Sequence, residues 1–183
     1  MENNKEQNIK ILKAVPEDAL GITTVLYKTW LDTYPNEEIG ITKEDVEESY
    51  KDHFTEERVK KQQENIANAP ANQLRLVAKS GDQVVGVSTM IRNENNNQLR
   101  TIYVLPEFQG RGIGQMLWKE AQKFCDSTKD TIVQVATYNK NAISFYEKLG
   151  FTDTGKRWSD DKWKMKSGAT IPEMELIIKV NNL

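Results

Sequence analysis

The stretch that decides the fold is Gln109-Gly110-Arg111-Gly112-Ile113-Gly114, which lies between a strand-like apolar segment and a helix-like one. Its three alternate glycines allow tight turns and let another backbone or a ligand approach closely. A helix that begins here presents unpaired N–H groups and the positive end of its dipole. The loop therefore favours a phosphate-bearing ligand, and a glycine-rich turn without a ligand is the alternative.

Two common nucleotide-binding motifs fit this loop poorly. If Gly110 and Gly112 are taken as the first pair of the dinucleotide-binding fingerprint, Gln115 stands where the third glycine belongs. The other phosphate-binding loop needs Gly-Lys-Ser/Thr, and that sequence does not occur in the chain. Neither of these two motifs therefore identifies the phosphate-bearing ligand.

The segments around the loop predict a mixed, mostly antiparallel sheet covered by helices. Alternating apolar residues and turn residues indicate the strands, and helical spacing of apolar residues with Pro16 in a first turn indicates the helices. The expected strands are 9–14, 74–78, 84–91, 99–104, 131–136, 151–155 and 173–180. The expected helices are 16–31, 42–68 in two pieces, 112–125 and 141–149. This order predicts an α+β domain with about seven strands and about four helices.

Length and composition restrict the class of protein. The 183 residues predict one domain, 1–183, with a polar tail over about 1–8. A net charge of -2 argues against a general nucleic-acid binder, and no apolar run approaches the roughly 20 residues of a membrane-spanning helix. Cys125 is the only cysteine and His53 the only histidine, so a His/Cys zinc site is implausible. The polar amino terminus lacks a secretory signal, and we expect a cytoplasmic protein without a metal or a membrane partner.

Two motifs together resemble one known family. Gln109-x-x-Gly112-x-Gly114 resembles the coenzyme A signature of the GNAT superfamily of N-acetyltransferases. Downstream, Asn139-x-Asn141-Ala142-x-x-Phe145-Tyr146-x-Lys148-x-Gly150-Phe151 is similar to a second family block at a helix-to-strand junction. The resemblance covers about residues 9 to 180, with firm motifs from 98 to 151. It implies a GNAT-like fold, acetyl-CoA as cosubstrate, and direct transfer of the acetyl group to an amine.

The resemblance also implies which residues bind acetyl-CoA. The pyrophosphate would lie on the backbone amides of the loop and of the helix start, namely Gln109, Gly110, Arg111, Gly112, Ile113, Gly114 and Gln115. Strands of the family splay apart here, so the backbones of Tyr103 and Val104 would bond the pantetheine and the Ile102 amide would face the acetyl carbonyl. Asn139 matches a position that contacts the cofactor's arm, with a turn or cap residue as the alternative. Arg111 would add a positive charge beside the pyrophosphate, and a solvated surface charge without a role in binding is the alternative.

The resemblance implies an acid, but it leaves the base open. Tyr146 matches the tyrosine that protonates the departing thiolate in many relatives; packing beside Phe145 is the alternative. Relatives often carry a Glu that acts as the general base where this chain has Gln98. Neither Gln98 nor Arg100 can accept a proton as a base does. The remaining candidates for the base are a water, a carboxylate of the 32–48 segment, Glu94 and His53.

The acceptor is the least determined part of the interpretation. One segment carries an excess of acids, which would attract a polyamine-like cation if it formed one wall of the acceptor cleft. These acids are Asp32, Glu37, Glu38, Glu44, Asp45, Glu47 and Glu48. A solvated acidic helix face is the alternative. A catalytically silent acyl-CoA-binding module and a protein or peptide N-acetyltransferase are the alternative functions, and a homodimer is expected from family analogy alone.

Four further side chains have structural interpretations. Trp118 and Cys125 are expected to pack on the sheet from the helix that follows the glycine loop. Trp158 and Trp163 are expected in a hairpin tip or loop between the last two strands.

Overall fold

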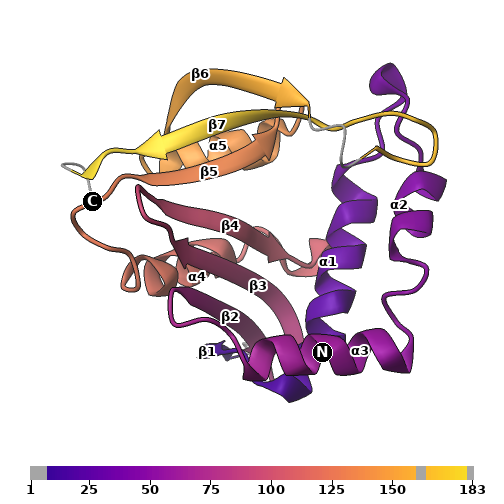
Figure 1. The fold of residues 1–183 in the computed structure, drawn as a ribbon, viewed down its shortest axis with the longest axis horizontal. Coiled ribbons are helices and arrows are strands. Elements are labelled where there is room, and N and C mark those ends of the chain that lie inside the picture. The colour runs from indigo at the N-terminus through magenta and orange to yellow at the C-terminus, as the bar shows by residue number, and fades with distance from the viewer. Residues whose placement is uncertain (1–7, 160–163, 181–183) are drawn as a thin grey trace, which may run out of the picture.

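The computed structural model describes residues 8–159 and 164–180, which form one seven-stranded sheet with helices on both faces (Figure 1). The strand order is β1-β2-β3-β4-β5-β7-β6. The strands are β1 (Ile9–Lys13), β2 (Gln73–Ser80), β3 (Gln83–Arg92), β4 (Asn97–Val104), β5 (Thr131–Ala136), β6 (Thr152–Ser159) and β7 (Pro172–Ile178). Only β4 and β5 pair in parallel, and all other neighbours are antiparallel. The mixed, mostly antiparallel α+β sheet is thereby confirmed.

The described residues contain five α-helices, where about four were expected. They are α1 (Ala19–Thr33), α2 (Lys43–Tyr50), α3 (Glu56–Ala67), α4 (Ile113–Gln122) and α5 (Lys140–Lys148). The polar region 42–68 divides into two helices, as expected, because each half has its own N-cap. The Thr42 side chain accepts from the Asp45 N–H and the Asp45 carboxylate accepts from the Thr42 N–H, which is a capping box with Asp as its acid. The Thr55 hydroxyl caps α3.

Two local expectations were wrong. Helix α4 ends at Gln122, so Cys125 lies just beyond the helix that carries Trp118, although both side chains pack against the core as expected. Trp158 lies within β6, because that strand continues past a bulge to pair with β7 as far as Ser159. The expected position of Trp163 falls outside the described residues.

Helices α1 and α3 cover one face of the sheet, and α4 and α5 cover the other (Figure 1). The central strand β3 contacts both α1 and α4, so it is buried on both faces. On the α4 side, Leu117 and Trp118 pack against the sheet, and Trp118 lies 5.3 Å from the Phe151 ring.

The sheet splits between β4 and β5. These two strands pair only through Asn97–Leu99 against Thr131–Val133, and beyond these residues they diverge toward α1 (Figure 1). The Leu105 N–H donates to the Val85 carbonyl at 2.9 Å on β3. Since antiparallel pairs alternate, the backbone of Tyr103 also turns to β3, whereas the backbone groups of Ile102 and Val104 point into the split.

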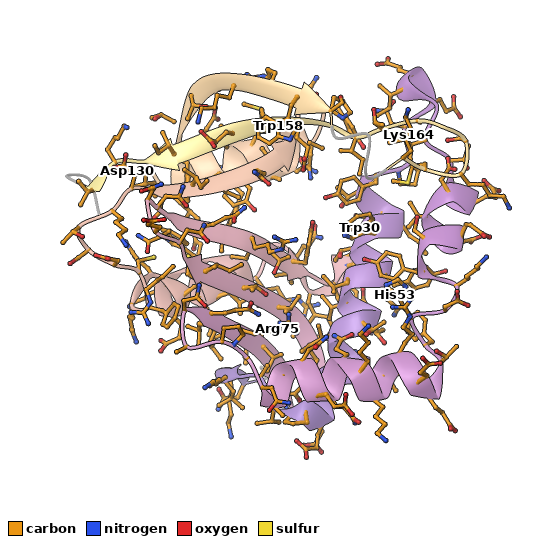
Figure 2. All side chains as sticks on the ribbon, in the orientation of Figure 1. Trp30, His53, Arg75, Asp130, Trp158 and Lys164 are labelled. Atoms are coloured by element: carbon orange, nitrogen blue, oxygen red, sulfur yellow. The ribbon has the colours of Figure 1, made fainter. Side chains whose placement is uncertain are left out.

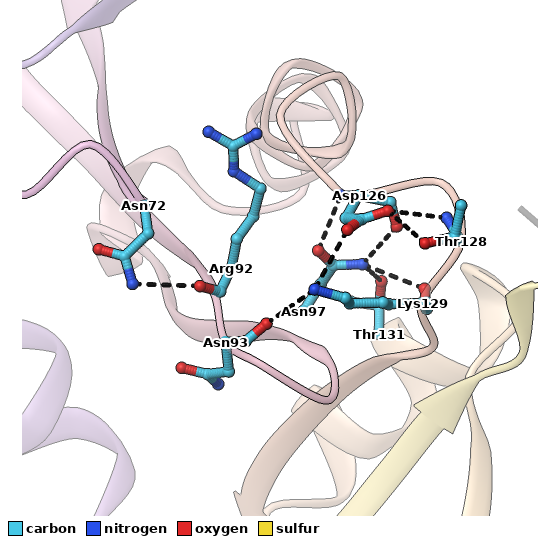
Figure 3. A network of polar contacts seen from close by, with 8 residues as sticks. All are labelled: Asn72, Arg92, Asn93, Asn97, Asp126, Thr128, Lys129 and Thr131. Atoms are coloured by element: carbon cyan, nitrogen blue, oxygen red, sulfur yellow. Dashed lines mark hydrogen bonds and ion pairs between the residues drawn. The ribbon is translucent and has the colours of Figure 1, made fainter.

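A buried polar network holds the closed end of the split (Figure 3). The fully buried Asn97 donates from Nδ2 to the carbonyls of Asp126 and Lys129, at 2.9 and 3.1 Å, and its Oδ1 accepts from the Asp126 N–H at 2.8 Å. The Lys129 ammonium donates to the Asn93 carbonyl and forms an ion pair with Asp126, each at 3.2 Å. These contacts tie the turn before β5 to the start of β4, so the two strands meet at this end and separate at the other.

Candidate functional site

The glycine loop delivers an open helix N-terminus to the mouth of the split. Gly110 and Gly112 have φ angles of 73° and 77°, in the left-handed region that favours glycine. Gly112 is the N-cap of α4, and no side chain of the described residues caps that helix start. The first N–H groups of α4, beginning with Ile113, therefore lack side-chain acceptors and can bind an anion, which the helix dipole also favours.

Gly114 brings the second sequence motif against the first. A Cβ atom at Gly114 would lie 3.1 Å from both Cε2 and Cζ of the Phe145 ring on α5. Only a glycine lets α5 approach the first turn of α4 this closely. The two family-like blocks, which are separated in sequence, thus form one continuous surface at the mouth of the split.

Two polar side chains fix the loop. The Gln109 amide donates from Nε2 to the Val104 carbonyl at 3.0 Å, so it ties the loop to the end of β4. The Arg111 guanidinium donates to the Glu107 carbonyl at 2.8 Å and lies 5.0 Å from the centre of the Phe108 ring. Although Arg111 is exposed, these contacts hold its charge beside the loop, which a freely solvated side chain would not do.

Tyrosine side chains converge on the open part of the split. The hydroxyls of Tyr34 and Tyr103 are 3.0 Å apart, and the Tyr138 hydroxyl donates to the Tyr34 carbonyl at 3.0 Å. Burial raises the pKa of the Tyr103 phenol, and it raises the pKa of Tyr138 to about 12. These hydroxyls keep their protons at neutral pH and can only donate or share hydrogen bonds there.

Tyr146 is buried between aromatic rings of α5 and the following strand. Its ring packs at 5.4 Å from Phe145 and 5.6 Å from Phe151, in edge-on geometry. Burial, and next the nearby Tyr103 phenol, raise the pKa of Tyr146 well above its ordinary value. The side chain is therefore a packing residue whose hydroxyl stays protonated at neutral pH.

Asn139 is the N-cap of α5. Its Oδ1 accepts from the Ala142 N–H at 3.0 Å, so the cap interpretation is confirmed. Its contact with the cofactor's arm stays a prediction.

The candidates for the base are scattered in the structure. Glu94 is exposed in the turn between β3 and β4, and His53 is exposed beside Tyr50, with ring centres 4.9 Å apart. In the acidic segment, Asp45 is buried and accepts from Thr42 and from the Ser167 N–H, so it has a structural role. Glu48 forms an ion pair with Lys51 at 2.5 Å.

Sequence reasoning missed Glu173, on β7. Its negative charge contributes, as the smallest of the named causes, to the raised pKa of both Tyr34 and Tyr103. Glu173 pairs across the sheet with Ala136 of β5 and with Trp158 of β6. The alternation of Glu173, Met174 and Glu175 within a strand could have indicated Glu173. Alternate residues of a strand point to opposite faces of the sheet, so both carboxylates lie on the face opposite the buried Met174.

The family is decided by a match that covers most of the chain. Residues 31–166, which include both motifs and the split, match the family model described as an acetyltransferase (GNAT) domain. This chain belongs to the GNAT acetyltransferase family. The GNAT fold expected from the two motifs is thereby confirmed.

Curated relatives and solved structures agree with this assignment. An uncharacterized N-acetyltransferase of Methanocaldococcus jannaschii is 40% identical over 58 residues, which are 31% of this chain and 26% of that protein. N-acetyltransferase 8F1 of Rattus norvegicus is 27% identical over 103 residues, which are 52% of this chain and 47% of that protein. The chain therefore aligns with less than half the length of these two relatives. The PaiA N-acetyltransferase of Thermoplasma acidophilum, solved with coenzyme A, has the same fold with a TM-score of 0.67 at 23% identity, covering 91% of this chain and 98% of that one.

Within 8–159 and 164–180, no three His, Cys, Asp or Glu side chains form a group that could hold a metal ion. None of the helices in the same residues combines the length and the apolar character needed to cross a membrane.

Proposed function

We propose that the protein is an acetyl-CoA-dependent N-acetyltransferase that transfers the acetyl group directly to a primary amine. The observation that carries this proposal is the uncapped N-terminus of α4 at the mouth of a split sheet, with α5 packed against it through Gly114 and Phe145. Family membership and the PaiA structure solved with coenzyme A support acetyl-CoA as the donor. No covalent intermediate is needed, because the lone Cys125 lies beyond the far end of α4.

Each part of acetyl-CoA has a group in the chain that suits it. The first N–H groups of α4 and of the glycine loop suit the pyrophosphate, and Arg111 adds a positive charge beside them. The backbone groups of Ile102 and Val104 that point into the split suit the pantetheine, which would extend the sheet as an added strand. Tyr103 turns its backbone to β3, so it would contribute through its phenol side chain.

The reaction needs one group that gives a proton to the departing thiolate and another that takes a proton from the attacking amine. The Tyr146 hydroxyl, which stays protonated at neutral pH, would give its proton to the departing thiolate. The Ile102 N–H would stabilise the negative charge that grows on the acetyl oxygen during attack. Glu173 lies opposite Ala136 of β5, and its charge contributes to the raised pKa of Tyr34 and Tyr103; we infer that it accepts the amine's proton, directly or through a water.

Release of free thiol tests the activity. Acetyl-CoA is incubated with amino acids, amino sugars, polyamines and peptides, and thiol formation is followed against a blank without protein. The proposal predicts amine-dependent release and an acetylated product of the matching mass. Tight binding of coenzyme A without turnover on any amine would instead identify a catalytically silent acyl-CoA-binding module, and turnover on peptides alone would identify a peptide N-acetyltransferase.

A further inference from the structure

A cavity of about 480 Å³ lies between the α1 and α3 helices and the sheet face formed by β2, β3 and β4. Its volume lies within the range of about 300–1,000 Å³ that is usual for small-molecule sites. We call it the cationic cavity, because its charged lining residues are Arg58, Lys61, Arg75 and Arg100. His53 lines it as well, and Figure 2 shows Arg75 on the sheet and His53 on the helix side.

The charge of the cationic cavity differs from that of the whole chain. The chain has a net charge of -2, yet no carboxylate is among the residues that line this cavity, all of which the structure describes. Within residues 8–159 and 164–180, none of its four cationic side chains forms an ion pair. Four cations in one hollow without counter-charges favour the binding of an anion.

Residues from three adjacent strands form the floor of the cavity in a single row. Arg75 of β2 pairs with Thr89 of β3, and Thr89 pairs with Thr101 of β4. The Arg75 side chain is half-buried, and this burial lowers the pKa of its guanidinium. The Thr101 hydroxyl is buried and has no hydrogen-bond partner among the described residues, so the row holds an unused hydroxyl on β4 and a half-buried cation on β2, with Thr89 between them.

A bulge in β4 places the cavity next to the proposed acetyl site. Thr101 pairs with Thr89 and Leu99 pairs with Met90, so Arg100 is the extra residue of the bulge. Arg100 and Thr101 line the cavity, and the next residue, Ile102, turns its N–H into the split. Two residues along a strand span about 7 Å, so the cavity and the Ile102 N–H are separated by no more than the length of a small amine.

The outer edge of the cavity has mixed charge. Arg58 and Lys61 also line a neighbouring hollow, together with the carboxylates of Asp52 and Glu57. Arg75 and Arg100 line only the cationic cavity. The half-buried Arg75 and the exposed Arg100 are therefore the two cations of the cavity that do not share a hollow with a carboxylate.

We infer that the cationic cavity binds the oxyanion of the acceptor, so that the acceptor is a small primary amine that also carries a carboxylate or a phosphate. Arg75 and Arg100 pair with the oxyanion and the Thr101 hydroxyl donates to it, while the amine extends past the bulge to the acetyl group. This inference rests on the proposed acetyl transfer, and it names an acceptor of opposite charge to the polyamine-like amine expected from the acidic 32–48 segment.

Two series of acceptors that differ in charge test the inference, and the members of the carboxylate series also have nearly equal length. The carboxylate series compares 4-aminobutanoate, 4-aminobutanamide and 1,4-diaminobutane, and the phosphate series compares phosphoethanolamine with ethanolamine. We expect the better of the two oxyanionic amines to exceed its neutral counterpart at least about tenfold in kcat/KM, because the neutral analogue leaves the arginines unpaired. The series with the larger difference identifies the carboxylate or the phosphate as the source. Equal or faster acetylation of the neutral amines or the diamine overturns the inference and leaves the proposed function intact.

Variants separate a role in acceptor binding from a structural role. Arg75→Gln and Arg100→Gln are each expected to raise KM for the oxyanionic amine at least about tenfold, with a smaller change in kcat and no change in KM for the neutral amine or in Kd for acetyl-CoA. Lys60→Gln is the matched control, since it removes one positive charge from the exposed side of α3 outside the cavity. An unchanged KM in both folded arginine variants overturns the inference.

A binding measurement keeps the inference testable without turnover. Calorimetry with 4-aminobutanoate or phosphoethanolamine, on protein saturated with coenzyme A, is expected to give binding that Arg75→Gln weakens at least about tenfold and Lys60→Gln does not. If oxyanion binding shows this pattern but no amine releases thiol from acetyl-CoA, the proposed function fails and the cavity assignment stands. If neither oxyanion binds, the cavity assignment fails whatever the turnover.

Discussion

Asn97→Ala should destabilise the protein more than the loss of most polar side chains. The substitution removes four hydrogen bonds, of 2.8, 2.9, 3.1 and 3.5 Å, from a fully buried side chain. Each is worth about 0.5–1.5 kcal/mol, and the Asp126 N–H and two carbonyls lose their partners, so we expect a loss of about 2–4 kcal/mol. For a chain of this size, that corresponds to a drop in Tm of about 4–16 °C.

Urea unfolding of the wild-type protein and the variant measures this difference. The matched control is Asn72→Ala in the same region, because Asn72 makes one exposed hydrogen bond of 3.1 Å to the Arg92 carbonyl. We expect the control to lie within about 0.5 kcal/mol of the wild type. If Asn97→Ala is as stable as Asn72→Ala, the polar network does not hold the closed end of the split, and the reasoning about the split is refuted.

Three further predictions concern the acid, the helix contact and low pH. Tyr146→Phe should lower kcat about 10²–10⁴-fold with little change in acetyl-CoA affinity, whereas a wild-type kcat would leave Tyr146 with a packing role only. Gly114→Ala should destabilise the protein by about 1–3 kcal/mol, because its Cβ would lie 3.1 Å from the Phe145 ring. Phe145→Leu in the same chain should reduce the loss caused by Gly114→Ala. Additive effects of the two substitutions on the free energy of unfolding would contradict the contact. Hydrogen bonds from Thr128, followed by contacts with Lys129, lower the pKa of Asp126 to about 2, below its unfolded value of about 3.9. The stability from Asp126 is therefore fully present above about pH 4 and lost as the pH falls toward about 2, and Asp126→Asn should make urea stability less dependent on pH across that range; an unchanged dependence would count against the assignment.

The glycine loop shows how much of the site could be predicted from local sequence. Gly110 and Gly112 adopt the left-handed conformation that their spacing suggested, and α4 begins directly after them. The Thr42 cap was also predictable, because the capping residue and its acid are three positions apart. These features depend on neighbours in the chain, which a single sequence displays.

The cationic cavity could not be predicted, because its residues come from distant segments. Arg58 lies on α3, Arg75 on β2 and Arg100 on a bulge of β4, and only the packing of α3 over the sheet brings them together. The structural role of Asp45 in the acidic segment could not be predicted for a related reason. Asp45 binds the Ser167 N–H, 122 residues away in the chain, and no local pattern indicates that contact.

The dissociation constant of coenzyme A for Gly112→Val tests the central claim, that the N-terminus of α4 binds the pyrophosphate. Gly155→Val is a matched control, since Gly112 and Gly155 have φ angles of 77° and 80° and neither has an atom within 4 Å of an added Cβ, yet Gly155 lies in β6 away from the loop. Calorimetry should show coenzyme A bound at least about tenfold more weakly by Gly112→Val, which is about 1.4 kcal/mol, and unchanged by Gly155→Val. Pantetheine, which lacks the pyrophosphate, should bind the wild type and Gly112→Val equally. Wild-type affinity for coenzyme A in a folded Gly112→Val protein would contradict the claim.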